Sequence, residues 1–278
     1  MLKIGFIDYY LDEWHANNYP RWISEESGGE AKVTLAWALM DSPKANGRTT
    51  QTWCKDMGIP MAGSIRQVLE ECDSVIVLSP DDCQLHEMLC DLPLRSGKPV
   101  FVDKTFSPDA ASAQRMFAKA AEYHTPCYSS SALRYATEYQ NQGHLDTICS
   151  WGPGSFDNYS VHQIEPVLMM MKGAPRRVMA LKYAERVAIA VEFEDGRLAT
   201  MDTLNGGPFL MHLSGEQGKR VVEAKSDYFR IFLREYIDFA KTGITPVAPE
   251  ETIAVMAVRE AGLHALSVPG TWIPVELR

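Results

Sequence analysis

Hydrophobic and polar positions in the first part of the chain alternate between strand-like and helix-like patterns. Short apolar runs rich in β-branched residues predict strands at residues 3–8, 31–41, 73–80, 98–104 and 125–133. Apolar residues at helical spacing predict helices at residues 13–26, 64–72, 81–97 and 109–123, the first broken or kinked at Pro20. Near-continuous apolar strands are typical of a parallel sheet covered on both faces. Residues 1–125 are therefore predicted to form an α/β domain with a doubly wound parallel sheet.

The rest of the chain, residues 126–278, has a different pattern of hydrophobic and polar positions. Residues 176–206 contain strand patterns about eight residues long, and Asp195-Gly196 between them is a strong hairpin signal. Two long helices are predicted at residues 228–243, with Gly243 as the stop signal, and at residues 249–268, with Pro249 near the start. This part is predicted to be an α+β domain with a mainly antiparallel sheet.

Composition and charge narrow the class of protein. The 278 residues are enough for two domains, and 27 basic against 36 acidic side chains give a net charge of -9. That sign opposes binding to a nucleic-acid backbone. The sequence has no apolar run long enough to span a bilayer, and its N-terminus enters a strand at once. Six scattered cysteines are typical of reduced thiols. We expect a cytoplasmic protein with neither a nucleic-acid nor a membrane partner.

One cluster has metal-binding residue types. Cys83, His86 and Cys90 fall on one face of a predicted helix. Leu89 shares that face, which would pack on the sheet, and the local sequence supplies no further ligand. We therefore expect buried structural side chains and no metal.

Ligands bind open parallel sheets beyond the carboxyl ends of the strands. Residues 8–13, 41–43, 79–82 and 103–105 follow predicted strands and are the candidates. Lys104 stands out, because an ammonium at the end of an apolar strand can meet a phosphate, hold a carbonyl or donate a proton. The alternative is a solvated lysine at a strand end.

The stretch "CDSVIVLSPDDCQLHEMLCDLPLRSGKPVFVDKTFSPD" resembles the signature of the glucose-fructose oxidoreductase and inositol dehydrogenase family, Gfo/Idh/MocA. A strand, a Ser-Pro turn, a helix with a histidine, a Gly-Lys-Pro-Val run and an acid-lysine pair follow one another at nearly the family's spacing. The segments "SALRYATEY" and "GPGSFDNYSVHQIEPVLMMMKGAPRRV" are similar to later family segments, and the C-terminal residues 239–275 resemble its closing helix and strand. The resemblance covers essentially the whole chain.

This resemblance implies a Rossmann-like dinucleotide-binding domain over residues 1–125 and a substrate-binding and oligomerisation domain over residues 126–278. It also implies an NAD(P)-dependent oxidoreductase that acts on a secondary alcohol or ketone of a sugar, inositol or related polyol. A homo-oligomer through the C-terminal sheet is expected, because that face commonly forms the interface in the family.

The resemblance also assigns candidate catalytic and substrate residues. The family's Glu-Lys-Pro becomes Asp103-Lys104-Thr105, so Lys104 is the catalytic or nicotinamide-positioning candidate. The family's Asp-x-x-x-His falls on Asn158 and His162, where an imidazole can exchange the proton of the reacting hydroxyl. Asn158 can orient by hydrogen bonds but carries no charge. A structural His162 on an amphipathic helix is the alternative. The remaining substrate-side candidates are Arg134 and Tyr135.

The turn after the first strand departs from the family. The three glycines of the family's turn correspond to about Asp8, Tyr10 and Glu13. These side chains obstruct the close approach of a pyrophosphate to the backbone. The carboxylates of Asp8, Asp12 and Glu13 would also repel it. His15-Ala16 keeps the family's register in the following helix. Either the cofactor binds less tightly, on helix N-terminal amides alone, or the chain no longer binds a dinucleotide.

The expected cofactor contacts, if one binds, follow from the same alignment. Asp41 would accept the adenosine ribose hydroxyls, which favours NAD over NADP, or it is a simple cap. The aromatic rings of Tyr9, Tyr10 and Trp14 would stack on a sugar or adenine, or fill a core or subunit interface. The cofactor-binding candidates are Asp8, Tyr10, Leu11, Asp41, Ser79, Pro80 and Lys104.

Two further functions stay open. The loss of the glycines, with Thr105 and Asn158 at changed motif positions, favours a non-catalytic ligand-binding or regulatory relative. A lyase that uses the same lysine without external redox chemistry is the third.

Overall fold

The computed structural model describes residues 1–184, 186–204 and 206–277. They divide into two compact units, each assembled from separate stretches of chain. The first contains Met1–Ser107, Gln114–Ser129 and Arg230–Ala248, and the second contains Pro108–Ala113, Ser130–Phe229 and the residues from Pro249 onward. A single boundary near residue 125 therefore does not describe the units, because one helical segment returns to the first of them.

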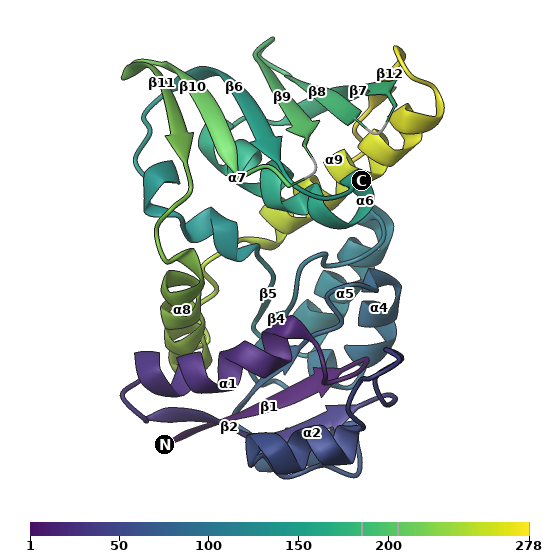
Figure 1. Ribbon diagram of the computed structural model, residues 1–278, viewed down its shortest axis with the longest axis vertical. Helices are drawn as coiled ribbons and strands as arrows, with labels where there is room; N and C mark the ends of the chain where they lie inside the picture. Colours follow the sequence, from purple (N-terminus) through teal and green to yellow (C-terminus); the bar gives the residue numbers. More distant parts are fainter. Residues whose placement is uncertain (185, 205, 278) are drawn as a thin grey trace. The chain divides into compact units, whose positions relative to one another are not determined.

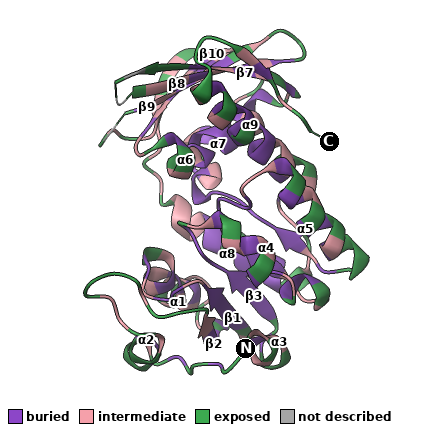
Figure 2. Ribbon diagram, turned by 90° about the vertical axis from the view of Figure 1, so that its right-hand side faces the viewer, coloured by how far each residue is buried: buried purple, intermediate pink, exposed green. Residues whose placement is uncertain are grey.

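The first unit is built on a parallel sheet (Figure 1). Its neighbouring strands are all parallel, in the order β2-β1-β3-β4-β5. Every residue of β3 is buried, as Figure 2 shows by colour, because helices cover both faces. The predicted doubly wound sheet is confirmed. The strand bounds are β1 (Leu2–Asp8), β2 (Ala31–Ala38), β3 (Ser74–Val77), β4 (Val100–Val102) and β5 (Cys127–Tyr128).

The helices between these strands are α1 (Trp14–Glu26), α2 (Thr50–Met57), α3 (Ile65–Glu71), α4 (His86–Leu89) and α5 (Ala110–Glu122). Short 3-10 helices span Cys83–Leu85 and Pro93–Arg95, so the predicted helix over residues 81–97 forms only in pieces. Pro93 contributes to this, because it stands at the start of the second 3-10 helix and has no backbone N–H to donate to a helical hydrogen bond.

Helix α1 runs through Pro20, so of the predicted break or kink the break is not found. A proline inside a helix removes one backbone hydrogen bond. Ala16, Tyr19 and Ile23 are buried on one face of α1. Their packing offsets the lost bond, since most helix stability in proteins comes from a buried apolar face.

Helix α8 (Tyr228–Thr242) contributes residues from Arg230 onward to the core of the first unit. The ring of Phe232 lies 5.0 Å from that of Phe101 and 5.9 Å from that of Tyr19, between centroids. The hydroxyl of Tyr236 lies 3.0 Å from Ser74 Oγ. Aromatic packing therefore joins a late helix to the first sheet.

The second unit contains a seven-stranded sheet of order β11-β10-β6-β9-β8-β7-β12. Among the described strand pairs of this sheet, only β6–β9 is parallel, so the predicted mainly antiparallel sheet is confirmed. Gly196, with a φ of 84°, forms the predicted hairpin turn between β8 and β9. The predicted strand patterns do not include β6, β10 or β11. The bounds are β6 (Leu145–Gly152), β7 (Pro175–Tyr183), β8 (Arg186–Phe193), β9 (Leu198–Thr203), β10 (Leu210–Gly215), β11 (Gly218–Glu223) and β12 (Trp272–Pro274).

The helices of the second unit are α6 (Phe156–Tyr159), α7 (Val161–Met171) and α9 (Pro249–Ser267), with 3-10 helices at Ala132–Tyr135 and Thr137–Tyr139. Helix α7 packs on β6 and on α9, and α9 packs on β7, so one face of the sheet is covered (Figure 1). Residues of β8 alternate between buried and partly exposed, as expected for a sheet with one covered face. Among the described helices, none has the length and apolarity needed to cross a membrane.

Candidate functional site

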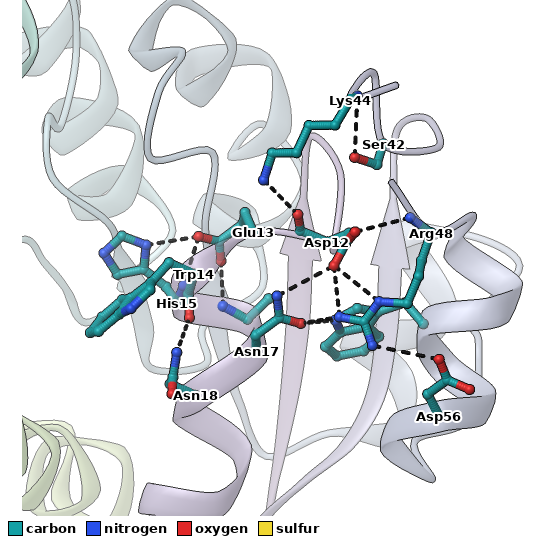
Figure 3. Close-up of polar contacts among 12 residues, drawn as sticks. Asp12, Glu13, Trp14, His15, Asn17, Asn18, Ser42, Lys44, Arg48 and Asp56 are labelled. Atoms are coloured by element: carbon teal, nitrogen blue, oxygen red, sulfur yellow. Dashed lines mark hydrogen bonds and ion pairs between the residues drawn. The ribbon is translucent and has the colours of Figure 1, made fainter. Parts of the chain in front are cut away.

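The turn between β1 and α1, residues 9–13, ends in a carboxylate that caps the helix (Figure 3). Glu13 is only 3% exposed and its side chain accepts the backbone N–H groups of His15, at 2.7 Å, and of Ala16. His15 Nδ1 lies 2.8 Å from the same carboxylate. The first backbone donors of α1, which a phosphate would otherwise bind, are thus held by the chain's own acid.

The neighbouring Asp12 is bound from outside the turn. Arg48 donates from Nε at 3.0 Å and Nη2 at 2.6 Å to Asp12 Oδ1, and from its backbone N–H at 2.9 Å to Oδ2 (Figure 3). Lys44 Nζ donates to the Asp12 carbonyl oxygen at 2.9 Å. Partial burial raises the pKa of the Asp12 carboxyl, but the hydrogen bonds from Arg48 outweigh it and the pKa is lowered. The negative charge of the Asp12 carboxylate is therefore balanced by the guanidinium of Arg48.

Asp8, at the end of β1, is fully buried. Its Oδ1 accepts the N–H of Tyr9 at 2.7 Å, whereas its Oδ2 has no hydrogen-bond partner in the described part of the chain. Burial, and then the charges of Glu13 and Asp103, raise the pKa of Asp8 well above its usual range. This environment favours the neutral carboxyl.

The two remaining predicted residues of the turn, Tyr10 and Leu11, are buried side chains. The ammonium of Lys44 lies 5.3 Å from the centre of the Tyr10 ring. A pyrophosphate needs bare backbone and unclaimed amides at this position. The turn as it is built does not fit the pyrophosphate of a dinucleotide.

The other predicted cofactor positions have local partners. Asp41 is exposed and accepts the N–H of Thr50 at 2.7 Å, so it holds the start of α2. Ser79 is 2% exposed, has a φ of 92° and donates from Oγ to the carbonyl of Asp82 at 3.0 Å. The roles of Asp41, Ser79 and Pro80 toward a cofactor stay predictions.

Lys104 lies just beyond β4 and is only 8% exposed, unlike a solvated lysine at a strand end. Its Nζ lies 3.4 Å from the carbonyl oxygen of Pro80, to which it donates, and 3.6 Å from Asp103 Oδ2. The adjacent turn after β3 therefore holds the ammonium near the carboxyl ends of the strands. A buried lysine with a single carboxylate beside it can position or protonate a ligand oxygen.

In the second unit, His162 is the second residue of α7. Its Nδ1 lies 2.7 Å from Ser131 Oγ, and its ring lies between those of Tyr159 and Phe209, at centroid distances of 5.5 and 5.9 Å. Ser131 also caps a 3-10 helix by accepting the N–H of Leu133. The imidazole is thus held in one orientation by a hydroxyl that is itself held by backbone.

Glu165 is the residue that the sequence prediction omits. It lies one helical turn after His162 and accepts the backbone N–H of Ser131 at 2.6 Å. Arg134 lies 3.5 Å from Glu165 and donates to Glu251 at 2.7 Å. The predicted residues Arg134 and His162 are therefore joined through Ser131 and Glu165. The available signal is the last acid of the His-x-x-Asp pattern in the family stretch, where this sequence has Glu165.

The other predicted residues of this unit lie nearby in the chain. Tyr135 places its hydroxyl 3.2 Å from Ser130 Oγ, and Asn158 is half-buried in α6. Lys104 belongs to the first unit, whereas His162 belongs to the second. Their proposed cooperation stays a prediction.

Arg134 and Glu165 also line a pocket of about 530 Å³ in the second unit. A volume in this range accommodates a small molecule. Its wall is mostly apolar and is formed by the end of α7, the following loop and the start of α9. Other lining residues include Leu168, Met169, Pro175, Glu251, Ala254 and Val255.

Burial raises the pKa of Glu165 to about 7, against the lowering effect of Arg134. Because the folded state then binds more protons than the unfolded state between pH 4.5 and 7, the free energy of unfolding falls as pH rises through this window. At about 1.4 kcal/mol per pH unit, the contribution is about 3 kcal/mol. The Glu165→Gln variant is expected to lose this slope in urea titrations at a series of pH values.

The control for that measurement is Glu251→Gln, which removes the other carboxylate on Arg134 and so separates the loss of an ion pair from the loss of a buried titrating group. Identical pH slopes in the wild type and the Glu165→Gln variant would contradict the expectation.

The cysteine and histidine cluster of the first unit is a packed core. His86 is fully buried, with Nε2 2.7 Å from the carbonyl of Leu78 and Nδ1 3.0 Å from that of Phe106. No group of three or more His, Cys, Asp or Glu side chains within the described residues is arranged to hold a metal ion.

Comparison with known proteins finds one family model that matches part of this chain. Residues 24–130 match the model of the Gfo/Idh/MocA oxidoreductase family, described as an NAD-binding Rossmann fold. The predicted resemblance to the Gfo/Idh/MocA family is confirmed. The match covers β2 to β5 and includes Lys104, but it begins after the β1–α1 turn. A search of curated proteins gave no match.

Solved structures of other proteins share the fold of the chain over nearly its whole length. GenD2 from gentamicin A biosynthesis, in complex with NAD, has a TM-score of 0.80 at 14% identity, over 99% of this chain and 97% of that one. The myo-inositol dehydrogenase of Lactobacillus casei, with NAD(H) and myo-inositol, has 0.80 at 11% identity, over 99% and 97%. The scyllo-inositol dehydrogenase of the same organism, with NAD(H) and scyllo-inositol, has 0.77 at 14% identity, over 99% of both chains.

Proposed function

We propose that this chain is an oxidoreductase that interconverts a secondary alcohol and the corresponding ketone of a sugar, inositol or related polyol. The observation that carries the proposal is the hydroxyl-held imidazole of His162, 2.7 Å from Ser131 Oγ, at the position of the family's histidine. The family match and the shared fold with inositol dehydrogenases support the reaction class.

His162 would exchange the proton of the substrate hydroxyl. An imidazole titrates near neutral pH and can therefore take up that proton during oxidation and return it during reduction. Asn158, at the position of the family's aspartate, would orient by hydrogen bonds without adding charge. The contact of His162 Nδ1 with Ser131 Oγ, at 2.7 Å, would help to orient the imidazole.

Arg134 and Tyr135 would hold the oxygen atoms of the substrate, and Lys104 would position the nicotinamide or donate a proton. Ammonium, guanidinium and phenol groups donate to hydroxyl and carbonyl oxygens, which a polyol carries in number. The cofactor proposed is NAD or NADP. The family description, which names NAD binding, supports a dinucleotide, and Asp41 would favour NAD. The misfit of the β1–α1 turn bears on how tightly such a cofactor is held.

A second candidate function is a non-catalytic ligand-binding or regulatory protein that keeps the polyol site. The observation that favours it is the carboxylate of Glu13 on the first amides of α1. In that case the polyol would stabilise the fold, and no nicotinamide would be reduced.

The test is a panel of inositols, sugars and linear polyols offered to the purified full chain. Thermal stability is measured with each compound alone, because a ligand that binds only the native state raises its stability. Nicotinamide absorbance is then followed with millimolar NAD or NADP and the stabilising compounds. Turnover supports the oxidoreductase, and stabilisation without turnover favours the second candidate. The absence of both effects would contradict both functions.

A homo-oligomer through the partly exposed face of the seven-stranded sheet stays a prediction. Light scattering that gives a monodisperse monomer at micromolar concentration would contradict it.

A further inference from the structure

We propose that Glu13 is a built-in competitor of the dinucleotide: its carboxylate occupies the α1 amides, and a pyrophosphate binds there only by displacing it. The inference rests on the proposed function only in taking a dinucleotide as the cofactor. The loss of the glycines predicts a low affinity for a dinucleotide, and we assign this low affinity to the side chain of Glu13.

The first step is geometric. The backbone N–H groups of His15 and Ala16 both point to the Glu13 carboxylate, and Glu13 is nearly inaccessible to solvent. The N–H of Asn17 is taken by the Glu13 carbonyl, at 3.0 Å. A ligand phosphate that used these donors would have to break existing hydrogen bonds of a well-ordered cap.

The second step is electrostatic. A carboxylate at a helix N-terminus interacts favourably with the helix dipole, and it takes the place that a phosphate would otherwise occupy. It also repels a second anion brought to the same position, and this repulsion is strong because the site is shielded from solvent. The charge on Asp12, in contrast, is met by the guanidinium of Arg48.

The third step separates Glu13 from the other changed positions. The environment of Asp8 favours its neutral form, and Tyr10 is packed under Lys44. These two side chains obstruct close approach to the backbone but hold no α1 amide. Glu13 is therefore the residue whose replacement frees the donors and removes the negative charge together.

The experiment compares the wild-type chain with Glu13→Ala and Glu13→Gln. NADH and NADPH are titrated with nicotinamide fluorescence and thermal stabilisation as readouts, and inorganic pyrophosphate serves as a probe without a nicotinamide. The alanine variant is expected to bind NADH at least 10-fold more tightly than the wild type. Its own melting temperature falls without ligand, since it loses a helix cap.

Glu13→Gln keeps the length of the side chain and removes the charge. It is expected to gain less affinity than the alanine variant, because an amide oxygen can still accept the same N–H groups. It also serves as the test if the alanine variant does not fold. The matched control is Glu25→Ala near the other end of α1, which removes the same charge and is expected to leave NADH affinity unchanged.

Two results would overturn the inference. One is micromolar binding of NADH or NADPH by the wild type with no gain in either Glu13 variant. The other is a fully folded Glu13→Gln variant that gains no affinity for pyrophosphate or for either dinucleotide. If instead affinity rises but no polyol is oxidised by any variant, the competitor stands and the proposed function fails.

Discussion

Replacing His162 by asparagine is expected to lower the rate constant for polyol oxidation by about 100-fold to 10,000-fold, the usual contribution of a general acid or base. Asparagine keeps a polar side chain that can remain near Ser131 but cannot exchange a proton at neutral pH. The expected loss is in kcat, because in the proposed function the imidazole exchanges the proton of the reacting hydroxyl. Polyol affinity, measured by thermal stabilisation, is expected to change much less.

The control is His264→Asn, the same substitution at an exposed histidine of α9. Rates are measured with saturating dinucleotide in the wild-type and the Glu13→Ala backgrounds, so that weak cofactor binding does not mask the effect. The alternative from the sequence is that His162 is a structural residue. In that case the opposite pattern is expected, with a lower melting temperature and a nearly unchanged kcat.

Ser131→Ala in the same assay tests whether the hydroxyl orients the imidazole. The expected result is a smaller loss of kcat than for His162→Asn, because the proton-exchanging group remains but loses the contact at Nδ1. Ser131 is therefore a positioning residue in this proposal.

Replacing Phe232 by alanine is expected to lower the free energy of unfolding by about 3 to 5 kcal/mol, the range measured for buried phenylalanines. Phe232 is 1% exposed and packs against Phe101 of β4 and Tyr19 of α1. Truncation leaves a cavity between a helix near the end of the chain and the sheet formed by its beginning. The effect is measured by urea titration followed by circular dichroism and tryptophan fluorescence.

Glu235→Ala on the same helix is the matched control, because Glu235 is exposed and its removal creates no cavity. If Phe232→Ala stays within about 1 kcal/mol of the wild type, α8 does not belong to the core of the first unit. The result would also show that a boundary near residue 125 describes the folding units better than the discontinuous division does.

Local patterns were sufficient for much of the fold. The apolar strands of the parallel sheet, the Asp195-Gly196 hairpin and the two long C-terminal helices follow from spacing and turn residues, because these signals depend on neighbours in the chain. Strands β6, β10 and β11 lie outside the predicted strand patterns, although the buried and exposed residues of β6 alternate over part of its length. The conformation of β6 is stabilised by pairing with β9 and β10, far along the chain.

The candidate site divides in the same way. The sequence by itself determined that the β1–α1 turn has no glycine and that His15-Ala16 keeps the helix in register. Only the tertiary structure decided where the acids of the turn lie: Asp12 meets Arg48, 36 residues away, and Asp8 is buried. Likewise Ser131 meets His162 and Glu165 across more than 30 residues. Residue types limit what chemistry is available, whereas burial and partners distant in sequence set charge and orientation, and those come only from the fold.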